Sequence, residues 1–136
     1  MVRIIFDMKK EEKLLKIDNV LFKVNNLERS SNFYQQEFGL KKLWEDKKNK
    51  MVGFVFPKND SEIVIHNNKN LPKFDFSFLV KNVNDFVNHF LKKGFKIFQK
   101  PINVRCGKYA VLLDLDHNKI PIIDLTSFNN KPKYLK

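Results

Sequence analysis

The side chains that could do chemistry are few in this chain, and they are spread along it. Glu62 and Asp75 lie within alternating apolar segments, so either carboxylate could act as a general base in a partly dry site. Cys106 is the lone cysteine, which excludes an internal disulfide and fits a reducing compartment. The sequence contains no Ser-His-Asp arrangement, Cys-x-x-Cys pair, His-x-x-x-His helix or glycine-rich phosphate loop. These residues alone indicate no reaction, so whether the protein is an enzyme stays open and no catalytic residue is assigned.

The chain is strongly basic, with a net charge of +11 from 26 Lys and Arg against 15 Asp and Glu. Phosphate contacts supply most non-specific nucleic-acid affinity, so this charge invites a polyanion-binding interpretation. Arginine, which favours base readout and bidentate phosphate contact, occurs only at Arg3, Arg29 and Arg105. The lysines are scattered in pairs such as Lys47-Lys48 and form no tract. A solvated basic surface is therefore the favoured interpretation, and a nucleic-acid partner is not expected.

Two stretches of the chain repeat one another, and this repeat predicts the architecture. In the first copy an alternating strand ends at Val24 and a helix follows to Gly39; in the second a strand ends at Val80 and a helix follows to Gly94. Each helix leads into a basic, apolar strand. The period-two pattern and the polar turns predict strands at 17–24, 40–45, 51–56, 62–66, 74–80, 95–98, 106–114 and 119–125.

One domain is expected over residues 17–125, which is long enough to bury a real core. Module one spans 17–67 and module two spans 73–125, and each reads as strand, helix and three strands. Residues 1–16 form an N-terminal extension, and residues 126–136 form a basic tail that is expected to fray. No apolar run approaches the ~20 residues of a membrane span, so a cytoplasmic protein without membrane contact is expected.

The repeat resembles the vicinal oxygen chelate superfamily, which includes the glyoxalase I, bleomycin-resistance and extradiol-dioxygenase families. Residues 24–34 read Val-Asn-Asn-Leu-Glu-Arg-Ser-Ser-Asn-Phe-Tyr, where the family typically has valine, a short Asp-Leu turn and a Ser-x-x-Phe-Tyr helix. Residues 38–40 stand at its Leu-Gly-Leu, and residues 114–118 at its Asp-Pro-Asp-Gly-Asn turn. The resemblance covers residues 17–125. It implies an α+β fold in which two βαβββ modules form a curled mixed sheet with a cleft between them.

The resemblance also indicates where metal ligands would stand. Metal-dependent members place one ligand in the first strand of each module and another late in each module. By register from the repeated valines, the first-strand positions hold Asn19 and Asp75, where a histidine pair would be usual. The late positions fall near Val64 and Pro121. A neutral amide is a poor ligand and proline supplies none, so the ligand set is largely absent, and neither a metal nor another cofactor is expected.

An irregular metal site is the alternative. His66, Glu62 and Asp75 could supply ligands, with Asp124 recruited if Pro121 causes a bulge. A chain with such a ligand set would be a metal-dependent lyase or dioxygenase.

The favoured interpretation is a glyoxalase/bleomycin-resistance-like protein that binds a small organic ligand in the cleft between its modules, without a catalytic metal. The chain is basic, and Lys23 and Lys119 are candidates for the cleft side, so a neutral or anionic ligand is expected. A homodimer is also expected. The candidate ligand-binding residues share the inward-facing strand positions: Asn19, Leu21, Lys23, Met51, Val64, His66, Asp75, Ser77, Tyr109, Lys119 and Pro121, with Trp44 added if its strand parity is favourable.

Overall fold

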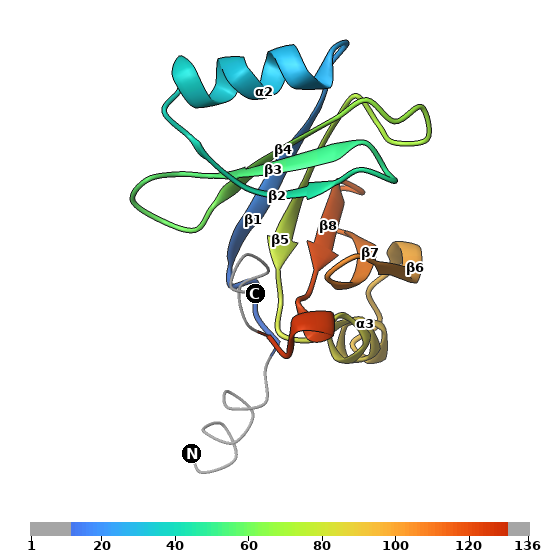
Figure 1. Ribbon diagram of the computed structural model, residues 1–136. Helices are drawn as coiled ribbons and strands as arrows, with labels where there is room; N and C mark the ends of the chain where they lie inside the picture. The colour runs from blue at the N-terminus through green and yellow to red at the C-terminus, as the bar shows by residue number, and fades with distance from the viewer. Residues whose placement is uncertain (1–11, 131–136) are drawn as a thin grey trace. The chain divides into compact units, whose positions relative to one another are not determined.

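The computed structural model describes residues 12–130, and the elements within them follow the predicted repeat (Figure 1). The α+β class and the two βαβββ modules are therefore confirmed. The elements are β1 (Lys16–Lys23), α2 (Leu27–Gln36), β2 (Lys41–Asp46), β3 (Met51–Val55), β4 (Glu62–His66), β5 (Phe74–Leu79), α3 (Val83–Lys92), β6 (Ile97–Val104), β7 (Gly107–Leu113), β8 (Lys119–Ile123) and a 3-10 turn, η1 (Thr126–Phe128).

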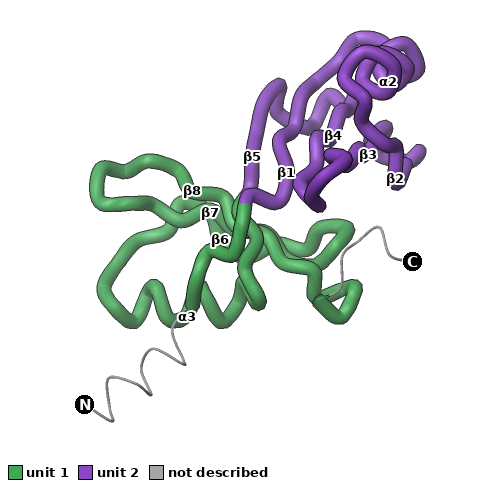
Figure 2. Tube along the Cα trace, turned by 90° about the vertical axis from the view of Figure 1, so that its left-hand side faces the viewer, with its two compact units in different colours: residues 1–16, 78–131 green, residues 17–77, 132–136 purple. Residues whose placement is uncertain are grey.

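The described chain divides into two compact units (Figure 2). Unit 2 comprises residues 17–77, from β1 to the first part of β5. Unit 1 comprises residues 12–16 and 78–130, which include the end of β5, α3 and the last three strands. The strands are hydrogen-bonded in the order β2-β3-β4-β1-β5-β8-β7-β6, an open mixed sheet in which β1 runs parallel to β4 and β5 parallel to β8.

The two helices explain why the repeat can be recognised in the sequence. Asn26 and Asn82 cap them, and each carboxamide oxygen accepts a backbone N–H from the third residue beyond it at 2.9 Å. Gly39 and Gly94 follow the helices with φ of 68° and 90°, a left-handed conformation that glycine adopts without steric cost. Both modules therefore use the same start and stop residues for a helix of 10 residues.

The core of unit 2 lies between α2 and one face of the strands. Val52, Phe54 and Ile65 are almost fully buried there, and Tyr34 of α2 stacks on Phe54 with ring centroids 5.8 Å apart. Burial of that site raises the pKa of the Tyr34 hydroxyl. Because side chains alternate along a strand, the intervening residues of β1, β3 and β4 point to the opposite side, which we call the helix-distal face of unit 2.

The core of unit 1 is built in the same way. Val83 and Val87 of α3 pack against Ala110, Leu112 and Ile122 of β7 and β8, and all five are buried. The alternate residues of β7 and β8 form the helix-distal face of unit 1. Among the described residues, no helix has both the length and the apolar composition that a membrane span requires.

Two segments differ from the sequence prediction. The strand expected at residues 95–98 is β6, which begins at Ile97 and continues through Pro101 to Val104. Pro101 and two register shifts are tolerated because β6 ends the strand order and needs partners only on the β7 side. Residues 126–128 form η1, anchored where Ser127 N–H donates to the Cys106 carbonyl at 3.0 Å. Residues 1–11 of the predicted extension and 131–136 of the predicted tail lie outside the described residues.

Candidate functional site

Most of the predicted ligand-binding residues of unit 2 share its helix-distal face. The parallel register of β1 with β4 and the antiparallel register of β3 with β4 put their side chains on one side of the strands. Asp75 precedes Ser77 by two residues in β5, so alternation gives it the same side, and its Oδ1 accepts the Phe76 N–H at 2.9 Å. The residues that this face brings together are Asn19, Leu21, Lys23, Met51, Val64, His66 and Ser77.

Trp44 belongs to this face, and its indole is held by a buried acid. Trp44 in β2 pairs with Gly53 in β3, and its Nε1 donates to Oε1 of Glu62 at 2.8 Å. Glu62 is only 3% exposed. The indole occupies the space above Gly53, where a Cβ atom would overlap its ring. The glycine within an otherwise regular strand is thus explained by the close approach of this ring.

A second polar group on the face centres on Asn19. Its Nδ2 donates to Oδ2 of Asp18 at 2.8 Å and to Oγ of Ser77 at 3.0 Å. Asp18 and Ser77 are each 3% exposed, whereas Asn19 is half-buried. Both donor hydrogens of the carboxamide are used, and its Oδ1 has no hydrogen-bond donor among the described residues. This oxygen is therefore an oriented acceptor, because its own amide group fixes the plane of the side chain.

His66 is fully buried and holds a loop. Its Nδ1 accepts the backbone N–H of Asn68 at 3.0 Å, and its Nε2 lies 2.7 Å from the carbonyl oxygen of Pro72. A carbonyl can only accept and a backbone N–H can only donate, so the partners assign the neutral tautomer with the proton on Nε2. Both ring nitrogens are occupied within residues 66–72, which leaves neither lone pair for a metal ion.

The other proposed members of an irregular metal site have structural partners too. Asp124 is fully buried in unit 1, where Oδ2 accepts the Val83 N–H at 2.8 Å and Oδ1 accepts the Lys108 N–H at 2.9 Å. The β7–β8 register runs through Pro121 without a shift, so the bulge considered there is absent. Within residues 12–130 no group of three or more His, Cys, Asp or Glu side chains could hold a metal ion.

The three predicted residues that fall in unit 1 lie on its helix-distal face. Tyr109 packs beside Ile123 in a small apolar cluster around Cys106. Lys119 is exposed, and its Nζ lies 4.0 Å from the ring centroid of Phe98. Pro121 is buried opposite Val111. Their part in ligand binding stays a prediction.

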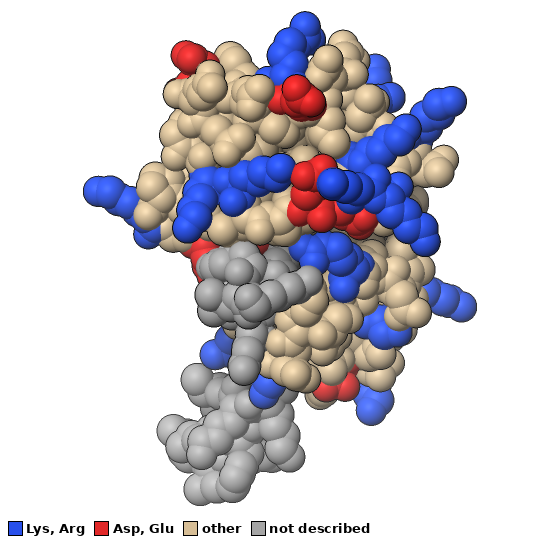
Figure 3. Space-filling model, viewed as in Figure 1, with Lys and Arg blue, Asp and Glu red and all other residues tan. Residues whose placement is uncertain are grey.

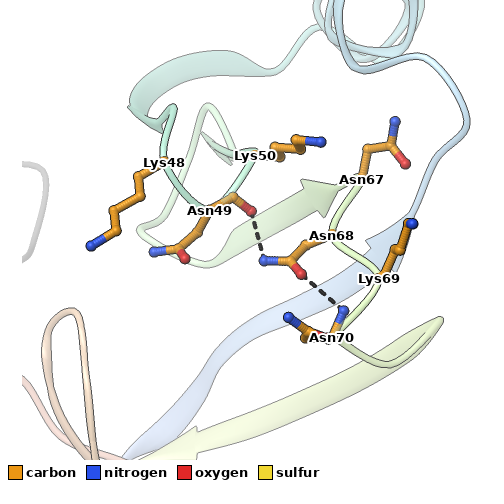
Figure 4. A pocket seen from close by; sticks show the side chains of 7 residues that line it. All are labelled: Lys48, Asn49, Lys50, Asn67, Asn68, Lys69 and Asn70. Carbon is orange, nitrogen blue, oxygen red and sulfur yellow. Dashed lines mark hydrogen bonds between the residues drawn. The ribbon is translucent and has the colours of Figure 1, made fainter.

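A polar basin, which sequence reasoning missed, lies between the β2–β3 turn and the loop after β4 (Figure 4). Its volume is about 510 Å³. Asn68 joins the two sides by donating from Nδ2 to the Asn49 carbonyl at 3.1 Å. The signal available in the sequence is the Asn-rich run after His66. The lining residues are Lys48, Asn49, Lys50, Asn67, Asn68, Lys69 and Asn70.

On the face drawn in Figure 3, basic side chains are spread from top to bottom, and acidic groups lie beside those near the middle. One described pair, Lys42 with Glu45, has Nζ and Oε1 2.9 Å apart, and the hydrogen bond from Lys42 holds the pKa of Glu45 below its usual value. Whether this surface has a polyanionic partner stays a prediction.

Comparisons with known proteins agree with this geometry. The family described as the Glyoxalase/Bleomycin resistance protein/Dioxygenase superfamily matches residues 16–122. Among curated proteins, none matches the chain.

Solved structures resemble the chain at low sequence identity. The one titled NAD-dependent benzaldehyde dehydrogenase from Legionella pneumophila is 24% identical, with a TM-score of 0.58 over 79% of this chain and 97% of that one. Methylmalonyl-CoA epimerase from Mycobacterium tuberculosis is 12% identical, with a TM-score of 0.62 over 80% and 87%. A superfamily member from Vibrio splendidus 12B01 is 8% identical, with a TM-score of 0.54 over 84% and 99%. These similarities establish the fold alone.

Proposed function

Because the chain belongs to the glyoxalase/bleomycin resistance protein/dioxygenase superfamily, we propose that it binds a small, neutral or anionic organic molecule on the helix-distal face of unit 2, without a catalytic metal. The observation that carries the proposal is the oriented acceptor Oδ1 of Asn19, which stands beside the apolar pair Leu21 and Val64. Small-molecule sites combine an apolar lining with a few fixed polar groups, and this face has both.

The ligand's polarity follows from the groups around that acceptor. A hydroxyl or N–H of the ligand would donate to Asn19 Oδ1, while an apolar part contacts the half-buried Met51, which lies on the same face as the buried Leu21 and Val64. Lys23, at the end of β1, is exposed and could receive a carboxylate or another anionic group. The net charge of +11 favours the approach of anions over cations.

The donor chemistry supports a site without a metal. Both nitrogens of His66 are committed to protein partners. Freeing them for a cation would break hydrogen bonds of buried groups, which costs about 1–3 kcal/mol for each group. The alternative that would replace this proposal is a metal-dependent lyase or dioxygenase.

The test uses Trp44, the single tryptophan, as a reporter beside the site. Titration with small carboxylic acids and neutral aromatic compounds should give a saturable fluorescence change for at least one compound. Asn19→Ala should weaken that binding about tenfold, because the ligand loses its hydrogen bond to Oδ1 of Asn19. Asn32→Ala on the exposed side of α2 is the matched control and should leave the affinity unchanged.

Two results would overturn the proposal. One is saturable binding that Asn19→Ala leaves untouched. The other is a stoichiometric Zn, Ni, Fe or Mn ion in the purified protein, whose removal by a chelator lowers the melting temperature.

We also propose that the chain works as a cytoplasmic homodimer. Exposed apolar side chains support the dimer. Phe98 and Ile102 on β6, at one end of the strand order, are 56% and 48% exposed. Light scattering at micromolar concentration should give about twice the chain mass of 16.2 kDa. A species of the single-chain mass across that range would contradict the dimer.

A further inference from the structure

We propose that the polar basin between the β2–β3 turn and residues 67–70 binds a phosphoryl or pyrophosphoryl group of a small molecule. This site is separate from the helix-distal face, so its failure would leave the ligand proposed there untouched. All seven lining residues are lysines or asparagines, and none is acidic. Lysine ammonium groups and carboxamide N–H groups are donors, which is the chemistry that an oxyanion with several acceptor oxygens requires.

The charge of the basin is not neutralised by the described part of the chain. Among residues 12–130, no carboxylate pairs with the ammonium group of Lys48, Lys50 or Lys69. The acid that adjoins the turn in sequence is Asp46, the last residue of β2, whose two carboxyl oxygens accept from the backbone and side chain of Asn49 at 3.1 and 2.8 Å. Three positive charges against this one acid leave an excess that attracts an anion of charge −2 or more.

The two sides of the basin are tied together, so their donors are partly preorganised. The Asn67 N–H donates to the Lys50 carbonyl at 3.0 Å. Asn68 is held by its bond to the turn and by the buried ring of His66, and its Oδ1 accepts the Asn70 N–H at 2.9 Å. The basin walls therefore need little ordering when a ligand binds, which lowers the entropic cost. The Asn70 carboxamide has no hydrogen-bond partner among the described residues and can turn toward an anion.

Lys50 gives a second indication. Its φ is 55°, a left-handed conformation in which glycine or asparagine is the usual residue. The turn would accept either without strain, yet a long cationic side chain stands there beside Asn67 (Figure 4). The size fits a compact oxyanion group with room to spare, because about 510 Å³ falls within the range of small-molecule sites.

The experiment follows backbone amide signals by NMR while inorganic pyrophosphate is added at low ionic strength, with inorganic phosphate and chloride as comparison anions. The signals of residues 67–70 should shift saturably with pyrophosphate and weakly with phosphate. The combined variant Lys48→Gln, Lys50→Asn and Lys69→Gln should weaken binding at least about tenfold. Lys50→Asn suits the left-handed turn, so this variant should keep its fold, and its unchanged amide spectrum elsewhere will show it.

The matched control removes three exposed lysines that lie elsewhere, through Lys58→Gln, Lys81→Gln and Lys100→Gln. It carries the same net charge as the basin variant and should keep pyrophosphate affinity within about twofold of the parent. Equal loss in both variants would mean diffuse charge attraction and would overturn the site. So would shifts spread over lysines across the surface, or binding of random-sequence duplex DNA through the basin lysines without any response to pyrophosphate.

Discussion

Gly53→Ala is the substitution that tests the helix-distal face most directly. A glycine-to-alanine change in a β-strand ordinarily stabilises a protein by about 0.4–1 kcal/mol, because the unfolded chain loses conformational freedom. At position 53 the new methyl group would overlap the indole ring of Trp44. The ring must move, and its Nε1 then leaves the carboxyl oxygen of Glu62, now 2.8 Å away. The expected sign is therefore reversed.

The magnitude follows from the contacts that are lost. Overpacking at a tight site costs about 1–3 kcal/mol. Removal of the donor from Glu62, which is 3% exposed, adds about 1–3 kcal/mol, because a buried acceptor loses a partner. The ring regains some contacts when it settles elsewhere. We expect Gly53→Ala to lower the free energy of unfolding by about 3 kcal/mol.

Urea unfolding followed by far-UV circular dichroism measures the change, and Trp44 emission should move to longer wavelength as the indole becomes solvated. The cause is isolated by a double-mutant cycle with Trp44→Ala. In that background there is no ring to displace, so Gly53→Ala should cost less than about 0.5 kcal/mol. A loss of about 3 kcal/mol that persists without the indole would refute the reasoning and point to the backbone of β3 instead.

Two further predictions concern acids in unit 1. Asp124→Ala should lower the free energy of unfolding by about 4 kcal/mol in urea titrations, because the N–H groups of Val83 and Lys108 lose their buried acceptor. The control is Asp116→Ala at an exposed position. A loss below about 1 kcal/mol for Asp124→Ala, or an equal loss in the control, would contradict this. The side-chain hydrogen bond from Asn118, aided by backbone N–H donors, holds the pKa of Asp114 below its ordinary 3.8. The ionised group then stabilises the fold above pH 3.8 and loses this effect as the pH falls through the folded pKa. Asp114→Asn should accordingly be less stable than the parent near neutral pH, with the difference vanishing in strong acid; a difference independent of pH would contradict the pKa argument.

The fold was predictable because its determinants are local and repeated. Capping asparagines, left-handed glycines and period-two strands each act over a few residues, so one copy in the sequence checks the other. The strand limits of β4 were predicted to the residue, whereas β6 was predicted too short. Its polar stretch and Pro101 hid a strand that has a neighbour on one side only.

The side of the sheet on which the candidate residues lie was also predictable, but their partners were not. Alternation gave Asn19 and Leu21 one side of β1 from parity alone, whereas the position of Val64 came from the family resemblance. The contact of Trp44 with Glu62 joins residues 18 apart along the chain, and no local pattern reports it. His66 was a candidate metal ligand because a histidine in an apolar strand can coordinate a metal ion. Its hydrogen-bond partners, which the sequence does not reveal, are both backbone groups of the following loop.

The two modules share their helix caps and turns but differ in the side chains on their helix-distal faces. Asn26 and Asn82 cap the helices in the same way in the two copies, yet the residue of β3 opposite Val64 is Gly53, and the residue of β7 opposite the equivalent Pro121 is Val111. The glycine admits the Trp44 indole over the strand and brings a donor to buried Glu62, whereas a valine carries a side chain at that point. Equivalent strands therefore carry different chemistry, because caps and turns constrain the backbone of both copies but place no demand on the side chains of the helix-distal face. The polar groups that can orient a ligand are accordingly concentrated in unit 2, and a test at Asn19 probes the proposed function more sharply than one at Tyr109.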